Sequence, residues 1–153
     1  MDWLIQMLFV GLLAGSVVAG DAPRGFMELD ELEEAQAKAR KTGKLIALTV
    51  KGRDDACPRC AAALENGTKA IKSDCVMVFM RTAQARAGEG IPDNVHEKVK
   101  NSTEGAAVTF YVFDPELEEV LATASRKELE SGKKATRAFK DKVDDARKAL
   151  KEG

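Results

Sequence analysis

Two cysteines separated by two residues, Cys57 and Cys60, form the pattern in this sequence that is best suited to chemistry. Pro58 and Arg59 lie between them. A thiolate attacks the disulfide of another molecule through a mixed-disulfide intermediate, and a second nearby thiol can then displace the product. The pair therefore predicts thiol–disulfide exchange, with a Cys57–Cys60 disulfide as the oxidised form of the site.

The position of the motif assigns a different role to each cysteine. An apolar run over residues 44–50 precedes it, and a helical pattern begins at Pro58, so Cys57 falls at the N-cap of a helix. Unpaired backbone N–H groups there favour an anion, so we expect a lowered pKa for Cys57, the attacking thiol. Cys60 shares a helical face with Leu64 and Ile71, so we expect it to be more buried and to act as the resolving thiol.

Two other interpretations of the cysteines stay open. Cys57 and Cys60 could form a fixed structural disulfide, or they could join Cys75 and His96 in a Cys₃His zinc site. Cys75 opens a second apolar run, as a buried core cysteine does, and His96 lies in a polar stretch on a short helix. The leading interpretation therefore includes neither a metal nor any other cofactor.

The first 20 residues have the composition of an export signal. Residues 4–19 are apolar except for Gln6 and Ser16, and a helix of that length is shorter than the ~30 Å hydrocarbon core of a membrane. Val17 and Ala19 fit the small-residue positions of a cleavage site. We expect residues 1–20 to be a signal peptide, or alternatively an uncleaved anchor, which would be the chain's only membrane contact. Either one predicts a periplasmic or secreted domain, where disulfides persist.

The charge balance excludes a large class of partners. The chain has 24 Lys and Arg against 25 Asp and Glu, and Asp2 is the only charged side chain among the first 20 residues. The remaining domain is therefore neutral, whereas nucleic-acid binding depends on clustered positive charge. We expect no nucleic-acid partner.

The elements that must position the cysteines alternate between helices and buried strands. Three apolar runs read as strands, and the last of them is followed by Asp114-Pro115 and a shorter strand, as in an antiparallel hairpin. This order predicts an α/β fold, a three-layer α/β/α sandwich around a mixed four-stranded sheet. The expected helices are 30–42 with an Asp30–Glu33 capping box, 58–72 with a possible kink at Asn66-Gly67, a short one after Pro92, and 126–151; the expected strands are 44–50, 75–80, 106–113 and 120–124.

A strand, a Cys-x-x-Cys that opens a helix, another strand, then a hairpin and a closing helix resemble the thioredoxin family over residues 28–151. The resemblance is strongest to exported thioredoxin-like domains with an Ala-rich helix and a Lys-rich turn, here residues 37–44. It implies a thioredoxin fold, exchange at the two cysteines, and a substrate-facing loop at Ala107, Val108 and Thr109. The implied partners are cysteine-containing exported proteins or a redox partner.

Three departures from that family motivate a second hypothesis. Ala56 stands where a tryptophan usually precedes the first cysteine, and Val108 stands where a cis-proline faces the disulfide. The loop before the motif is longer, and Thr49, Val50 and Lys51 include no counterpart of the buried acidic base. The alternative to an oxidoreductase is therefore a binding module that keeps the dithiol without turnover.

Overall fold

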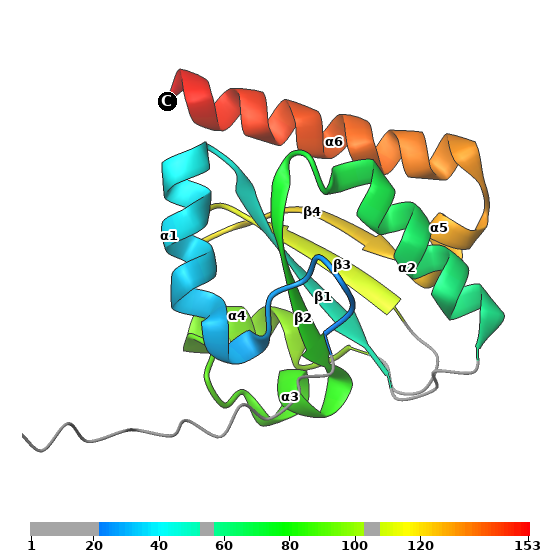
Figure 1. The fold of residues 1–153 in the computed structure, drawn as a ribbon, viewed down its shortest axis with the longest axis horizontal. Coiled ribbons are helices and arrows are strands. Elements are labelled where there is room, and N and C mark those ends of the chain that lie inside the picture. Colours follow the sequence, from blue (N-terminus) through cyan, green and yellow to red (C-terminus); the bar gives the residue numbers. More distant parts are fainter. Residues whose placement is uncertain (1–21, 53–56, 103–107) are drawn as a thin grey trace, which may run out of the picture.

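The computed structural model describes residues 22–52, 57–102 and 108–153 (Figure 1). They form an α/β fold around one mixed four-stranded sheet with the strand order β2-β1-β3-β4. β1 pairs in parallel with β2 and antiparallel with β3, and β3 and β4 form the predicted hairpin. The strands are β1 (Leu45–Lys51), β2 (Cys75–Arg81), β3 (Val108–Phe113) and β4 (Val120–Ser125), and the helices are α1 (Leu32–Thr42), α2 (Pro58–Ile71), α3 (Thr82–Ala87), α4 (Asp93–Val99), α5 (Arg126–Glu130) and α6 (Lys133–Glu152).

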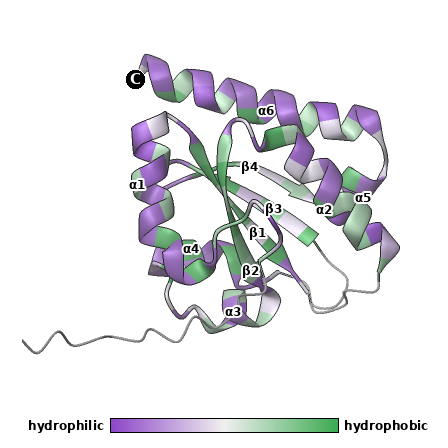
Figure 2. Cartoon of the chain, viewed as in Figure 1, coloured by the Kyte–Doolittle hydropathy of each residue, from purple (hydrophilic) through white to green (hydrophobic). Residues whose placement is uncertain are grey.

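Helices cover both faces of the sheet, so the predicted three-layer sandwich is confirmed, and the arrangement is compatible with a thioredoxin-like fold. Apolar residues of α1, α3 and α4 pack against one face, and those of α2, α5 and α6 pack against the other. Figure 2 shows the apolar sheet between helices whose outer sides are hydrophilic. We call these two apolar clusters the α1 side and the α2 side of the sheet.

The central strand β1 is buried along its whole length, as its apolar run predicts. Successive side chains of a strand point to opposite faces. Ile46 and Leu48 therefore pack on the α1 side, whereas Leu45 and Ala47 pack on the α2 side with Cys60. β1 thus joins the two halves of the core, and it is the strand that precedes the cysteine motif in the chain.

The first helix begins two residues later than predicted. Residues Leu29–Glu31 form a 3-10 turn, and α1 follows it and ends at Gly43, whose φ of 65° suits a residue without a Cβ. The expected Asp30–Glu33 capping box is wrong, because the Glu31 carboxylate instead accepts a hydrogen bond from the backbone N–H of Glu28 at 2.7 Å. The chain is fixed at that point since the neighbouring Met27 pairs with the edge of β2, opposite Val78.

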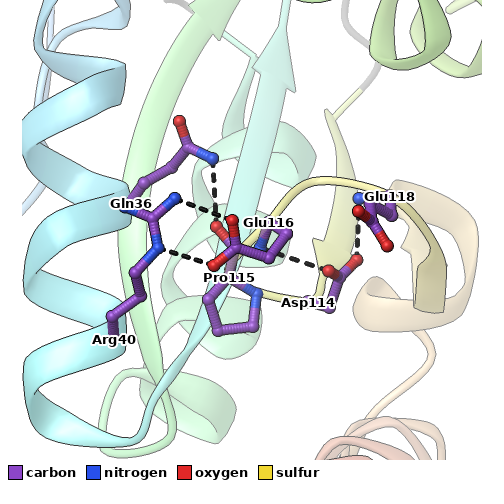
Figure 3. A network of polar contacts seen from close by, with 6 residues as sticks. All are labelled: Gln36, Arg40, Asp114, Pro115, Glu116 and Glu118. Carbon is purple, nitrogen blue, oxygen red and sulfur yellow. Dashed lines mark hydrogen bonds and ion pairs between the residues drawn. The ribbon is translucent and has the colours of Figure 1, made fainter.

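The turn of the hairpin is fixed from within and from α1 (Figure 3). The Asp114 carboxylate accepts backbone N–H groups of Glu118 and Glu119 at 2.9 and 2.7 Å. Arg40 of α1 donates two hydrogen bonds to the Glu116 carboxylate at 2.6 and 2.8 Å. Gln36 donates another to the Pro115 carbonyl at 3.0 Å. The first helix is therefore tied to the turn of the distant hairpin.

The predicted closing helix over residues 126–151 is wrong as a single element. The chain forms the short helix α5, turns at Ser131 and Gly132, and then forms α6. Gly132 has a φ of 106°, which a helix cannot accommodate and which favours a residue without a Cβ. Because of this break, the fully buried Leu129 of α5 packs on the α2 side, so α5 lies beside α2.

Helix α2 passes through Asn66-Gly67 without the expected break. A Cβ at Gly67 would overlap the ring of Phe110 on β3, so glycine is needed for close packing of the helix on the sheet. Asn66 donates from its amide to the Leu129 carbonyl at 3.1 Å. Both residues thus serve to pack α2 rather than to end it.

The predicted leader, residues 1–20, lies outside the described residues. Within the ranges that the structure does describe, no helix combines the length and the apolar character needed to cross a membrane.

Candidate active site

The Cys-Pro-Arg-Cys motif opens α2 as predicted. Cys57 is the N-cap, with an extended backbone (φ −76°, ψ 110°), and its carbonyl accepts the first helical hydrogen bond from Ala61 at 3.1 Å. Pro58 occupies the first helical position, where its missing N–H leaves no partner unsatisfied. Cys57 is half-buried, whereas only 1% of the Cys60 surface is exposed. The expected difference in burial between the two thiols is confirmed.

The two sulfur atoms lie in direct contact. The structure holds them as thiols, and the Cys57 Sγ accepts two hydrogen bonds, from the Cys60 S–H at 2.7 Å and from the Cys60 N–H at 3.3 Å. Donors that point at a sulfur favour its anionic form. The geometry therefore suits Cys57 as the thiolate of the pair, and the disulfide between the two stays a prediction.

The environment of Cys60 has the opposite effect. Burial, the hydrogen bond to Cys57 and the charge of Cys57 raise the pKa of Cys60 to about 11, whereas the charges of Arg126 and Lys51 act to lower it. Cys60 therefore keeps its proton while Cys57 is the anion. Two of the three causes disappear once Cys57 forms a bond to another sulfur.

The predicted substrate-facing loop is described only in part. Val108, the first residue of β3, is fully buried and belongs to the α2 side together with Cys60, and Cys57 packs against that cluster. Thr109 pairs with Val50, whose side chain packs on the α1 side, so strand alternation points Thr109 away from the cysteines. Ala107 lies outside the described residues. The structure thus brings Val108, but not the Thr109 side chain, to the cysteine side of the sheet.

Two cations near the dithiol were not among the predicted site residues. Lys51 is the last residue of β1 and is only 7% exposed, and Arg126 opens α5. The strand alternation of residues 45–51 was a sequence signal for Lys51, because it places that side chain on the α2 side. No comparable signal marked Arg126, because α5 was expected to be part of a longer helix.

A shallow hollow of about 410 Å³ adjoins the motif. Its lining includes Pro58, Arg59 and Ala62 from the first turns of α2 and Glu130 from α5. Charges of both signs, Arg59 and Glu130, therefore border this hollow.

The third cysteine and the single histidine have structural positions. Cys75 is 3% exposed at the start of β2, and burial together with Asp74 raises its pKa to about 12, so it is an unreactive core thiol. The His96 Nε2 lies 2.9 Å from the Arg86 carbonyl, where it joins α4 to the end of α3. In the described part of the chain, no three His, Cys, Asp or Glu side chains lie together as metal ligands would, which gives the zinc interpretation no support.

Comparisons of the chain with protein-family models, with curated proteins and with solved structures returned no match. The fold and the geometry of the cysteine pair are therefore the observations on which a function can be proposed.

Proposed function

We propose that the protein is an exported thiol–disulfide oxidoreductase that acts on cysteines of other proteins. The observation that carries the proposal is the Cys57 Sγ, which lies at the N-terminus of α2 and accepts hydrogen bonds from both the S–H and the N–H of Cys60. That arrangement favours a thiolate at the half-exposed sulfur and keeps the second thiol in reach of it.

Apart from protons exchanged with solvent, the reaction needs only the protein's two thiols and the substrate disulfide. The Cys57 thiolate attacks one sulfur of a substrate disulfide, and the substrate's other sulfur leaves as a thiolate. Cys60 then loses its proton to solvent and attacks the Cys57 Sγ, which releases the second substrate sulfur. The substrate gains two electrons and two protons, and the protein ends as a Cys57–Cys60 disulfide. The reverse sequence oxidises a substrate dithiol.

Serine variants of each cysteine test this proposal. The assay measures how much the protein accelerates the reduction of insulin by dithiothreitol. We expect Cys57→Ser to abolish this acceleration, because the attacking sulfur is lost. Cys60→Ser should stop turnover but trap substrates on Cys57 as mixed disulfides. Cys75→Ser is the matched control and should retain activity, because Cys75 is buried away from solvent. Insulin reduction that is unchanged in Cys57→Ser would refute the proposal.

A second candidate is a binding module of the same fold without turnover. The buried, apolar Val108 at the start of β3 favours it, because the resemblance to thioredoxins implies a proline at that substrate-facing position. This candidate predicts that Cys57→Ser still captures the same partners as the unaltered protein, and that neither protein reduces insulin.

Export is tested separately from activity. We expect the intact mass of protein recovered from the exported fraction to show a chain that starts at Gly20 or Asp21. A full-length mass in the membrane fraction would indicate a retained anchor, and a full-length soluble protein would argue against export.

A further inference from the structure

Lys51 is a buried cation on the side of the sheet that carries the cysteines. It ends β1 with 7% of its surface exposed, and strand alternation places it on the α2 side, where Leu45 and Ala47 pack in one apolar cluster with Cys60. Across the sheet it is in register with Val108 of β3, another residue of that cluster. Burying an ammonium group costs free energy unless nearby groups compensate for it.

Other charged groups surround the motif, and they differ in how strongly they can act. Arg126 is about one-third exposed at its side chain, and its Nε lies 3.9 Å from the Glu130 carboxylate, so solvent and a counter-charge weaken it. Arg81 of β2 lies over the Phe79 ring and donates to the Gly52 carbonyl at 3.0 Å. Arg59 is exposed on α2. Arg53, Asp54 and Asp55 lie outside the described residues.

We propose that Lys51 is a positioning residue whose ammonium group stabilises the thiolate of Cys60 while that sulfur attacks the mixed disulfide on Cys57. This inference rests on the proposed oxidoreductase function and concerns its second step; among the described residues no Asp or Glu is buried to serve as a base. In the step, the Cys60 proton goes to solvent, the Cys60–Cys57 bond forms and the Cys57–substrate bond breaks.

The effect of the Lys51 charge on the Cys60 thiol supports this role. The positive charge of Lys51 acts on Cys60 against the effect of burial. Arg126 lowers the pKa of Cys60 more than Lys51 does, but a charge in a mostly buried position is screened less by solvent and salt than a surface charge, so the effect of Lys51 should persist as salt is added. When Cys57 becomes part of a mixed disulfide, its own negative charge no longer opposes ionisation of Cys60, and burial is then the remaining effect against which the cations act.

A reaction with a neutral disulfide reagent separates the two steps. In excess dithiodipyridine, the Cys57 thiolate releases one thiopyridone, and Cys60 then displaces the second from the mixed disulfide on Cys57. Because the second step is intramolecular, its rate does not depend on reagent concentration. Stopped-flow absorbance therefore reports the attacking and resolving thiols as two phases.

For Lys51→Met we expect the first phase to change by less than about twofold. The second phase should slow about tenfold near neutral pH, and its pH profile should move up by about one unit, since one unit corresponds to a tenfold change in thiolate. Lys51→Arg should restore most of the rate, and any slowing caused by Arg126→Gln should shrink as salt is added, whereas that caused by Lys51→Met should persist. Thermal unfolding of each variant verifies that the fold is retained.

Several outcomes would overturn the inference. One is a second phase of unchanged rate and pH profile in Lys51→Met, and another is an Lys51→Arg variant as slow as Lys51→Met, which would assign Lys51 a packing role. Failure of the proposed function looks different, because the unaltered protein itself would then show no concentration-independent second phase of thiopyridone release.

Discussion

At the scale of residues, the two sulfurs of the motif have different surroundings, because Cys57 is the N-cap of α2 and Cys60 lies within its first turn. Cys57 is half-exposed and accepts two hydrogen bonds from Cys60, whereas Cys60 is buried and donates hydrogen bonds from its S–H and N–H to Cys57. Hydrogen bonds to a charged form favour that form, and burial disfavours it. The arrangement thus favours the thiolate form at Cys57 and the thiol form at Cys60.

This coupling predicts that removing Cys57 makes Cys60 ionise more readily. The charge and the hydrogen bond of Cys57 raise the pKa of Cys60, so Cys57→Ala should lower that pKa from about 11, while burial keeps it above the ordinary 9.0. Each unit of decrease gives about ten times more thiolate at a fixed pH below it. The rate of Cys60 alkylation by iodoacetamide from pH 7 to 10, resolved by peptide mass in a Cys75→Ala background, measures the shift.

Cys57→Ser is the graded control for that measurement. Serine keeps a hydrogen-bond acceptor but carries no charge, so its alkylation profile should lie between those of the unaltered protein and Cys57→Ala. A Cys60 profile that is the same in all three proteins would show that Cys57 does not govern Cys60.

At the scale of elements, the close approach of α2 to the sheet depends on Gly67. Replacing Gly67 with Ala would force a methyl group into the ring of Phe110, and overpacking of this kind costs about 1–3 kcal/mol. Alanine also favours a helix over glycine by up to about 1 kcal/mol, so we expect a net loss of about 1–2 kcal/mol in unfolding free energy. Urea unfolding measures this loss.

The double variant Gly67→Ala/Phe110→Leu tests whether the overlap with the Phe110 ring causes this loss of stability. The smaller leucine leaves room for the added methyl, so the double variant should lose less than the sum of the two single changes. Strict additivity would mean that the contact between Gly67 and Phe110 does not limit the packing of α2.

The sequence was sufficient for most of these elements because their signals are local. The apolar runs, the proline after Cys57 and the Asp114-Pro115 turn identify the strands, the start of α2 and the hairpin directly. The break between α5 and α6 was missed, because the helical pattern continues through it and only Gly132 interrupts that pattern. The capping of the first helix was misassigned, because Met27 joins the sheet edge through a pairing distant in sequence.

The candidate site, like the elements, was predicted only in part from the sequence. Cys57 and Cys60 follow from the motif and its position before a helix, whereas Val108 was implied by the resemblance to the thioredoxin family. Arg126 could not be found, because its position near Cys60 depends on the chain turning at Gly132. Lys51 directly follows the expected strand, and alternation along that strand indicates its side of the sheet, but its burial is a tertiary property that local sequence does not show.

At the scale of the whole molecule, a single arginine connects segments that are far apart in the chain. Arg147 of α6 donates to the Gly43 carbonyl after α1 at 3.0 Å, to the Ser73 carbonyl before β2 at 3.2 Å, and to the Asp74 carboxylate at 2.8 Å. Its side chain is 21% exposed, so these charge-assisted bonds are partly shielded from water. Arg147 therefore fixes the closing helix across the end of the sandwich opposite the cysteines.

We expect Arg147→Met to lower the unfolding free energy by about 1–3 kcal/mol, because carbonyl and carboxylate acceptors would lose a charged donor. Arg147→Lys should restore only part of this, since an ammonium group cannot reproduce the planar fork. Arg40→Met is the control, because the pair of Arg40 with Glu116 is about half-exposed and should contribute little. Equal losses in Arg147→Met and Arg40→Met would contradict this account.

The central claim is that Cys57 and Cys60 form a redox-active pair, and a titration in glutathione buffers tests it most directly. Alkylation of free thiols followed by intact mass gives the oxidised fraction at each potential, with Cys75 as an internal thiol that stays reduced. We expect a Cys57–Cys60 midpoint between about −270 and −120 mV, where exchange catalysts operate. A disulfide that stays intact well below about −300 mV would identify a structural bond and contradict the account.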